Sequence, residues 1–200
     1  MSFHPQMPYG EGWHKSERTL PADGPAFAFS EANRASFEEI ASHYPPEQRK
    51  SAILAALYLA QEQQGYVSRQ VIRHVAEVIG CSAADVEDVV SYYVMFFTQP
   101  VGTYVLQVCR TLSCALNGAE RVTEALCKHL HIRPGETDAS GTFTLQEFEC
   151  LGACDRAPVV MVNNDHWHEG LKPDDVPAFV EALRTRGLAA LNGCHLVKEK

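Results

Sequence analysis

The stretch TYVLQVCRTLSC, residues 103–114, decides the fold, because a run of β-forming residues leads directly into a pair of cysteines. The stretch TFTLQEFECLGAC, residues 142–154, repeats the arrangement. Four residues separate the cysteines of the first pair, and three separate those of the second. If the two predicted strands are neighbours, the four thiols meet at one end of a sheet. The candidate site residues are Cys109, Cys114, Cys150 and Cys154.

Four thiols at these spacings admit three kinds of site. Structural zinc sites usually use tighter pairs such as C-x₂-C. A dithiol oxidoreductase needs C-x-x-C at a helix N-terminus, which neither pair offers. The plant-type ferredoxin pattern also differs, and no histidine stands beside either pair to indicate a Rieske centre. A [2Fe–2S] cluster needs two thiolates per iron, which two pairs in two loops supply. Spacing therefore favours the cluster and leaves zinc as the alternative.

The segment around the cysteines predicts a small α/β domain over residues 99–187. QPVG at 99–102 interrupts the preceding pattern, and the order that follows is β-α-β-β-β-α. Two strands joined through a helix should be parallel with a right-handed crossover, and a hairpin should add antiparallel strands. A mixed sheet follows. The expected strands are residues 103–109, 142–150, 158–163 and 166–171, and the expected helices are residues 117–132 and 172–187.

Residues 31–98 are predicted to form a small helical bundle, because apolar residues recur at helical spacing in four short segments. The second helix is expected over about residues 47–64 and should end at Gly65. Ser82 with Asp85 has the pattern of a capping box at the start of the fourth. The predicted fold class is therefore α+β, with a helical bundle followed by an α/β domain.

The two ends of the chain show no sustained periodicity. Residues 1–30 are expected to form an irregular arm, and residues 188–200 a C-terminal tail. The arm carries scattered aromatic residues, and the alternative interpretation is that these residues dock on a partner. They are Tyr9, Trp13, Phe27 and Phe29.

Composition excludes several classes of function. The 200 residues carry a net charge of −8, and residues 31–97 hold five basic against nine acidic residues, which disfavours nucleic acid. The longest apolar run, at 52–60, is far shorter than the roughly 20 residues that span a bilayer. The N-terminus lacks the apolar segment of a secretory signal. We expect a bacterial cytosolic protein that does not insert into a membrane itself. If the protein works at a membrane, we expect other subunits to anchor it there.

Three further cysteines and one histidine pair are not expected to bind metal. Buried free cysteine behaves as a small hydrophobic residue, and we assign that role to Cys81, Cys127 and Cys194. His166 and His168 share one face of a predicted strand. A solvated hairpin edge is the favoured interpretation for this pair.

Three segments of the chain are distinctive: KSAILAALYLAQEQQGYVS (50–68), YYVMFFTQPVGTYVLQVCRTLSC (92–114) and ECLGACDRAPVVMVN (149–163). Together they resemble the E-subunit family of NADH–quinone oxidoreductase, the respiratory complex I. The resemblance covers roughly residues 34–186, both halves in the same order. Neither end, residues 1–30 or the tail, has a matching counterpart.

The resemblance implies a helical region followed by a thioredoxin-like domain that holds one [2Fe–2S] cluster. The ligands it implies are Cys109, Cys114, Cys150 and Cys154. It also implies that the helical region docks on a flavoprotein subunit that binds NADH and FMN, among the other peripheral-arm subunits of complex I on the cytoplasmic side of the inner membrane. Related subunits serve NAD-linked hydrogenases and formate dehydrogenases, which are the alternative assignment.

The sequence contains no motif for a nucleotide or flavin site, so we expect the flavin on another subunit. The chain has no G-x-G-x-x-G motif and no P-loop. A two-electron donor such as NADH needs a flavin to split the electron pair, so a flavin-bearing partner is expected. The expected role of the four cysteines is ligation, with no side chain acting as acid, base or nucleophile. A free ferredoxin shuttle and a zinc-stabilised interaction module are the competing hypotheses.

Overall fold

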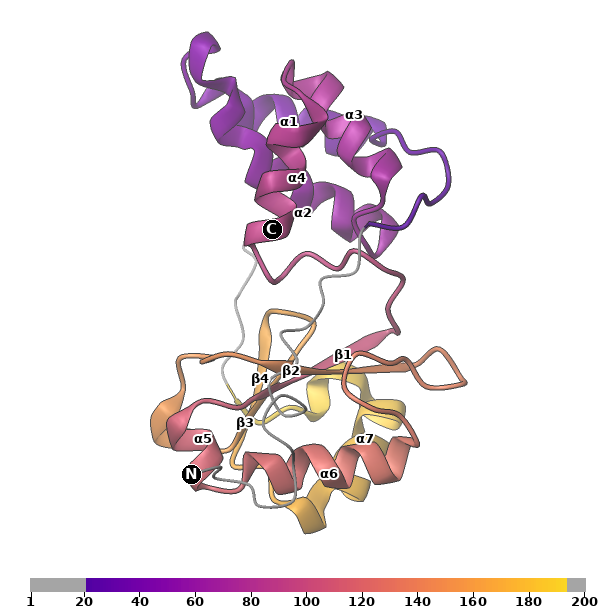
Figure 1. Cartoon of the computed structure of the whole chain (residues 1–200), viewed down its shortest axis with the longest axis vertical. Helices are drawn as coiled ribbons and strands as arrows, with labels where there is room; N and C mark the ends of the chain where they lie inside the picture. The colour runs from indigo at the N-terminus through magenta and orange to yellow at the C-terminus, as the bar shows by residue number, and fades with distance from the viewer. Residues whose placement is uncertain (1–20, 194–200) are drawn as a thin grey trace, which may run out of the picture. The chain divides into compact units, whose positions relative to one another are not determined.

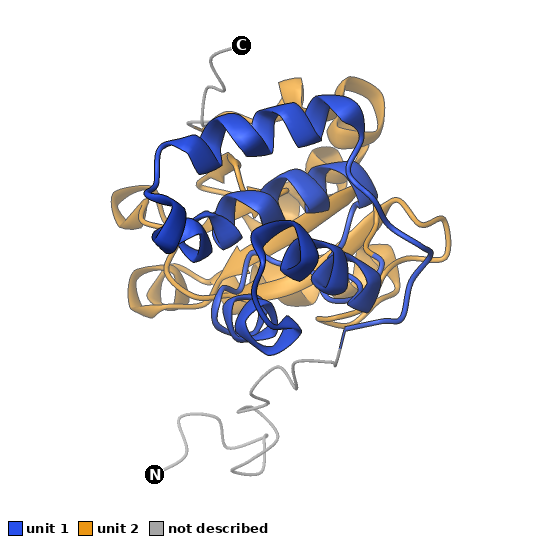
Figure 2. Cartoon of the chain, turned by 90° about the horizontal axis from the view of Figure 1, so that it is seen from above, with its two compact units in different colours: residues 1–100 blue, residues 101–200 orange. Residues whose placement is uncertain are grey.

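The computed structural model describes residues 21–193 of the chain (Figure 1). The chain divides into two compact units, residues 1–100 and residues 101–200 (Figure 2). The first unit is helical, and the second contains the sheet.

Short helices make up the first unit, and their ends follow local sequence signals. The Ser68 side chain caps α3, and Ser82 and Asp85 form the predicted capping box at the start of α4. Gly65 ends α2 in the left-handed conformation, as predicted, because a residue without Cβ adopts it freely. The helices are α1 (Glu31–Ser42), η1 (Pro46–Ala52), α2 (Ile53–Gln64), α3 (Arg69–Ile79) and α4 (Ala83–Tyr92).

The predicted helix over residues 47–64 is wrong in its first part. Residues Pro46–Ala52 form the tighter 3₁₀ helix η1, and the α-helix α2 starts only at Ile53. Gln48 has φ −108° and ψ 16°, which is not helical, and it follows the pair Pro45–Pro46. Pro46 stands at the first position of η1, where a backbone N–H would have no partner within the helix, so the irregularity lies at Gln48 and not at the prolines.

Fully buried apolar side chains hold this unit together, among them Phe37, Leu57 and Val71. The segment before α1 joins the same core. Phe27 and Phe29 pack against it with edge-on contacts to the His74 ring, so these two aromatics are used inside the unit. The other two aromatics of the predicted arm, Tyr9 and Trp13, lie outside the described residues.

The second unit is built on a four-stranded mixed sheet with strand order β2-β1-β3-β4. Strands β1 and β2 are parallel, and β3 is antiparallel to both β1 and β4. The sheet therefore has the predicted arrangement, and the α+β fold class is confirmed. The strands are β1 (Tyr104–Cys109), β2 (Phe143–Phe148), β3 (Val159–Val162) and β4 (His166–Glu169).

Helices α6 and α7 pack together on one face of this sheet (Figure 1). Leu106 of β1, Phe143 of β2, Leu126 of α6 and Leu183 of α7 are fully buried in one core. This core fixes the sheet, so the strand ends hold their positions. The remaining elements of the unit are α5 (Leu112–Leu116), α6 (Ala119–Leu130), η2 (Cys154–Arg156), η3 (Pro173–Asp175), α7 (Val176–Arg186) and η4 (Gly187–Ala190).

Within residues 21–193, no helix combines the length and the apolar character needed to cross a bilayer.

Candidate metal centre

The two cysteine-bearing loops leave the sheet side by side. Cys109 is the last residue of β1 and pairs in register with Phe148, the last residue of β2. The Arg110 N–H donates to the Phe148 carbonyl at 2.9 Å, which extends the ladder by one residue. Cys150 follows two residues later. Because the strands are parallel, both chains emerge at the same edge of the sheet, as the sequence predicted.

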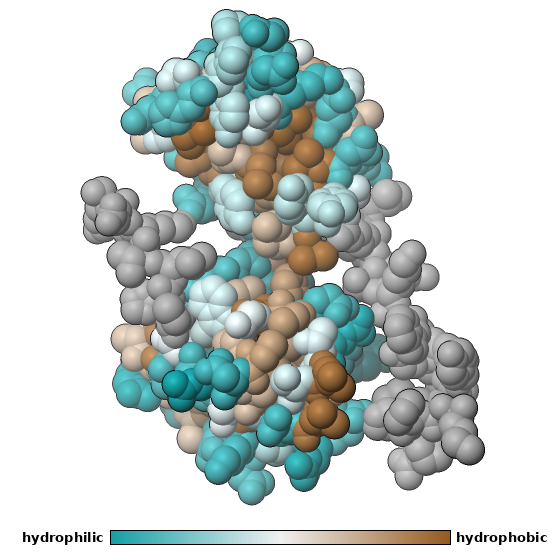
Figure 3. Space-filling view, turned by 90° about the vertical axis from the view of Figure 1, so that its left-hand side faces the viewer, coloured by the Kyte–Doolittle hydropathy of each residue, from teal (hydrophilic) through white to brown (hydrophobic). Residues whose placement is uncertain are grey.

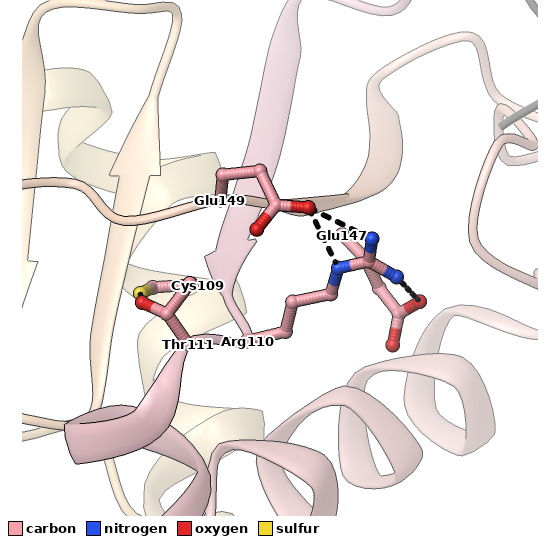
Figure 4. Close-up of polar contacts among 5 residues, drawn as sticks. All are labelled: Cys109, Arg110, Thr111, Glu147 and Glu149. Atoms are coloured by element: carbon pink, nitrogen blue, oxygen red, sulfur yellow. Dashed lines mark hydrogen bonds and ion pairs between the residues drawn. The ribbon is translucent and has the colours of Figure 1, made fainter. Parts of the chain in front are cut away.

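An ion-pair network joins these loops just outside the strands (Figure 4). Arg110 follows Cys109, and its guanidinium contacts the Glu149 carboxylate at 2.8 Å. A second carboxylate, that of Glu147, lies 4.0 Å from the same guanidinium. Glu149 directly precedes Cys150, so the network ties together the residues that flank one cysteine of each pair.

The four thiols lie in two pairs that differ in burial. Cys109 and Cys114 are each 2% exposed, because Cys114 sits on the short helix α5 and points into the core. Cys150 and Cys154 are exposed, with their Sγ atoms 3.5 Å apart. Helix α5 contacts η2, the turn that begins at Cys154. One pair is thus enclosed by protein, and the other faces outward.

Hydrogen-bond donors surround the Cys109 sulfur. The Thr111 hydroxyl lies 3.3 Å from Cys109 Sγ (Figure 4). The N–H groups of Thr111 and Leu151 and the Cys114 thiol also donate to it. Burial raises the pKa of the Cys109 thiol, but these donors outweigh it and hold the pKa below its ordinary value. A negative sulfur is therefore stabilised here.

The remaining three thiols interact with their neighbours in the same way. The Gly152 N–H donates to Cys150 and, with the Cys154 thiol, lowers the pKa of Cys150. Burial and the bond to Cys109 raise the pKa of Cys114 to about 11. The bond to Cys150 and its charge raise the pKa of Cys154. The charge on Cys154 also raises the pKa of Cys114, so the two pairs lie within electrostatic reach of each other.

The four thiols have the number and the pairing that a [2Fe–2S] cluster requires. A tetrahedral zinc site needs all four ligands around one point. A [2Fe–2S] cluster takes two thiolates on each of two irons, and the thiols lie as two pairs with N–H donors aimed at their sulfurs.

The other cysteines lie away from this site. Cys81 packs against the core of the first unit and Cys127 against that of the second, and both are partly buried. Burial is the main cause that raises the pKa of each. Both therefore behave as small apolar residues, although neither is fully buried. Cys194 lies outside the described residues.

The solvated hairpin edge predicted for the histidines is wrong for His168. β4 is the edge strand, but the His168 ring lies 4.6 Å from the Phe179 ring, centre to centre. Burial is the main cause that lowers the pKa of His168. His166 is also only partly exposed and contacts Asp165. The contact with the Phe179 ring of α7 contributes to this partial burial, and the pattern of β4 alone does not reveal it.

Several residues that shape the site escape sequence reasoning. Thr111 stands two positions after Cys109, and this spacing is the one sequence signal for a hydroxyl that donates to the Cys109 sulfur. From the sequence itself, only the small size of Thr111 is evident. The Trp167 indole N–H donates to the Leu151 carbonyl at 3.0 Å. No local signal predicts this bond, because Trp167 comes from a different hairpin. The ion pair between Arg110 and Glu149 likewise depends on which strands are neighbours.

Comparisons with known proteins agree with this geometry. Residues 37–184 match the model of the family "Thioredoxin-like [2Fe-2S] ferredoxin". The E subunit of the NADH-quinone oxidoreductase of Escherichia coli (strain K12) is 39% identical over 159 residues, covering 80% of this chain and 94% of that protein. The corresponding protein of Pseudomonas aeruginosa is 40% identical over 156 residues, covering 78% and 92%.

Among solved structures, an NAD+-reducing [NiFe]-hydrogenase in the air-oxidised state matches with a TM-score of 0.58 and 20% identity. The match covers 67% of this chain and 23% of that one, and it supports the fold alone. The family match spans most of the chain and includes all four paired cysteines. This chain belongs to the thioredoxin-like [2Fe-2S] ferredoxin family.

Proposed function

We propose that this chain is the electron-transfer E subunit of an NADH–quinone oxidoreductase and holds one [2Fe–2S] cluster. The proposed ligands are Cys109, Cys114, Cys150 and Cys154. The observation that carries the proposal is the meeting of two thiol pairs, each with N–H donors on a sulfur, at the ends of two parallel strands. Similarity to the E subunits of such enzymes, over most of their length, supports the choice of complex.

When bound, the cluster supplies a site that accepts and returns one electron. The chain's own residues hold it and set its surroundings. The enclosed Cys109 and Cys114 keep water from one side, and the hydroxyl and N–H donors stabilise negative charge on sulfur. No acid, base or nucleophile is assigned, so the role of this chain in the oxidoreductase is electron transfer.

The NADH and FMN sites are proposed to lie on a partner flavoprotein. Residues 99–187 would carry the cluster, and the helical bundle of residues 31–98 would dock on that partner. Figure 3 shows apolar surface on the helical unit, which supports docking. The exposed apolar side chains of this unit include Tyr92 at 76% and Val94 at 51% exposure. Leu112 and Leu116, on α5 beside Cys114, are also exposed. We further propose that the other peripheral-arm subunits hold this chain at the cytoplasmic face of a bacterial inner membrane.

Co-purification tests the assignment to a complex. The tagged chain should recover an FMN-binding, NADH-oxidising subunit together with membrane subunits from its own cells. Recovery with a soluble NAD-linked hydrogenase or formate dehydrogenase would move the same module to another enzyme. Recovery of the chain alone, still brown, would favour a free shuttle and contradict the proposal.

Metal and sulfide analysis tests the cluster, and one substitution tests a ligand. Two irons and two acid-labile sulfides per chain are expected, whereas zinc without sulfide would refute the cluster. Cys150→Ser should weaken or alter the EPR signal of the reduced protein. Cys127→Ser is the matched control, since Cys127 lies on α6 away from the paired thiols, and it should leave the spectrum unchanged. An unchanged spectrum for Cys150→Ser would remove that residue from the ligand set.

A further inference from the structure

Trp167 contacts the loop that carries the exposed cysteine pair. Its indole Nε1 donates to the Leu151 carbonyl at 3.0 Å, and Leu151 lies directly after Cys150. Trp167 belongs to β4, where it pairs in register with Met161 of β3. The ring also packs, partly buried, against the core of the unit. A side chain held in place by the sheet therefore donates a hydrogen bond to the backbone of the loop that carries Cys150 and Cys154.

The same peptide unit reaches a cysteine sulfur at its other end. The Leu151 carbonyl and the Gly152 N–H belong to one planar peptide group and point in opposite directions. The Gly152 N–H donates to the Cys150 sulfur. The chain of contacts runs from the Trp167 indole, through one peptide, to the Cys150 sulfur. Hydrogen bonds in series polarise one another, so the first strengthens the second.

The backbone at Gly152 has an unusual conformation and is open on one side. Gly152 has φ +80°, a conformation that only glycine adopts without strain. A Cβ atom placed on Gly152 would meet no described heavy atom within 4 Å. The peptide therefore lies at an open part of the loop, where the indole bond supplies a fixed anchor.

We propose that Trp167 is a positioning residue that turns the Leu151–Gly152 peptide so that its N–H faces the Cys150 sulfur, and that it thereby raises the reduction potential of the bound cluster. The inference rests on the proposed function. Reduction adds negative charge to a cluster, and an N–H aimed at a ligand sulfur stabilises that charge. Loss of the anchor should make reduction less favourable.

The test uses the full chain with its cluster and a redox titration followed by EPR. Trp167→Phe removes the indole N–H and keeps an aromatic ring. Replacement of Trp167 by benzothienylalanine keeps the bicyclic shape and removes only the donor, so it decides the question if the Phe variant folds poorly. We expect the equilibrium constant for reduction to fall about threefold to tenfold, and tenfold corresponds to about 59 mV for one electron.

His168→Phe serves as the control on the same strand, because it keeps a ring against Phe179. It should leave the midpoint potential unchanged. Equal midpoint potentials in the wild type and both Trp167 variants would overturn the inference and reduce Trp167 to a packing residue. A wild-type chain that binds no cluster would instead overturn the proposed function itself, so the two failures are distinguishable.

Discussion

Removal of the cluster should expose a large difference in reactivity between Cys150 and Cys114, one thiol of each pair. The thiolate is the reactive form of cysteine, so reactivity depends on pKa and access. Cys150 is exposed, and its pKa lies below the ordinary value because the Gly152 N–H and the Cys154 thiol donate to it. Cys114 is 2% exposed, and its pKa is raised to about 11. Cys150 should therefore be alkylated first.

The size of the difference follows from these pKa values. At pH 8, a thiol with a pKa of about 11 is ionised in about one molecule per thousand, whereas an ordinary thiol with a pKa of about 8.5 is ionised in about one in four. The more basic thiolate is intrinsically more nucleophilic, which offsets roughly tenfold to twentyfold of that gap. Cys150 should thus react at least about tenfold faster than Cys114, before burial slows Cys114 further.

A short iodoacetamide pulse, followed by peptide mass mapping, measures these rates in cluster-free, reduced protein. The rate at Cys114 should rise about tenfold per pH unit up to about pH 11, while the rate at Cys150 levels off at a lower pH. The cluster-loaded protein should be protected at both sites. Cys127, whose pKa burial raises, should stay slow in both states. Equal labelling of Cys114 and Cys150 at pH 8 would refute the reasoning.

Three further perturbations test the fold and the loops. Leu126→Ala should lower the free energy of unfolding by about 2–5 kcal/mol in urea titrations, because Leu126 is fully buried. Asp85→Asn should lower the melting temperature at pH 7 but not near pH 2. The pKa of Asp85 in the folded protein is about 2, mainly because the Ser82 hydroxyl donates to its carboxylate. The stabilisation by this carboxylate is therefore present above its ordinary pKa of 3.8 and is lost as the pH falls toward 2. Arg110→Met should cost less than about 1 kcal/mol in unfolding, because its ion pair with Glu149 is exposed, yet speed bleaching of the cluster by a chelator.

The sequence predicted those helix ends that depend on contacts between residues close together in the chain. The capping box of Ser82 and Asp85 and the turn at Gly65 each involve residues within one turn of helix, so a short window contains the whole cause. The start of α2 was misplaced because the non-helical conformation of Gln48, inside η1, leaves no mark on the apolar spacing.

The meeting of the cysteine loops could also be predicted, because parallel neighbouring strands end at one edge of a sheet. The side chains that approach from other elements could not. Trp167 reaches Leu151 only because β3 and β4 fold back as a hairpin, and the partly buried His168 packs against the Phe179 ring of α7. These contacts follow from tertiary packing, and no sequence window contains both partners.

The number of backbone N–H donors at each thiol follows its burial. Cys109, where water is excluded, receives two backbone N–H groups besides the Thr111 hydroxyl and the Cys114 thiol. The exposed Cys150 receives one backbone N–H besides the Thr111 hydroxyl and the Cys154 thiol, and it has access to solvent. A buried negative sulfur without such donors would be costly. Arg110, the basic residue next to Cys109, is directed to two carboxylates instead. The site thus compensates negative charge with neutral dipoles, and the effect of a dipole depends on its orientation more than that of a full charge does. On the proposed function, anchored peptides such as Leu151–Gly152 are therefore the means by which the fold adjusts the electron affinity of the cluster.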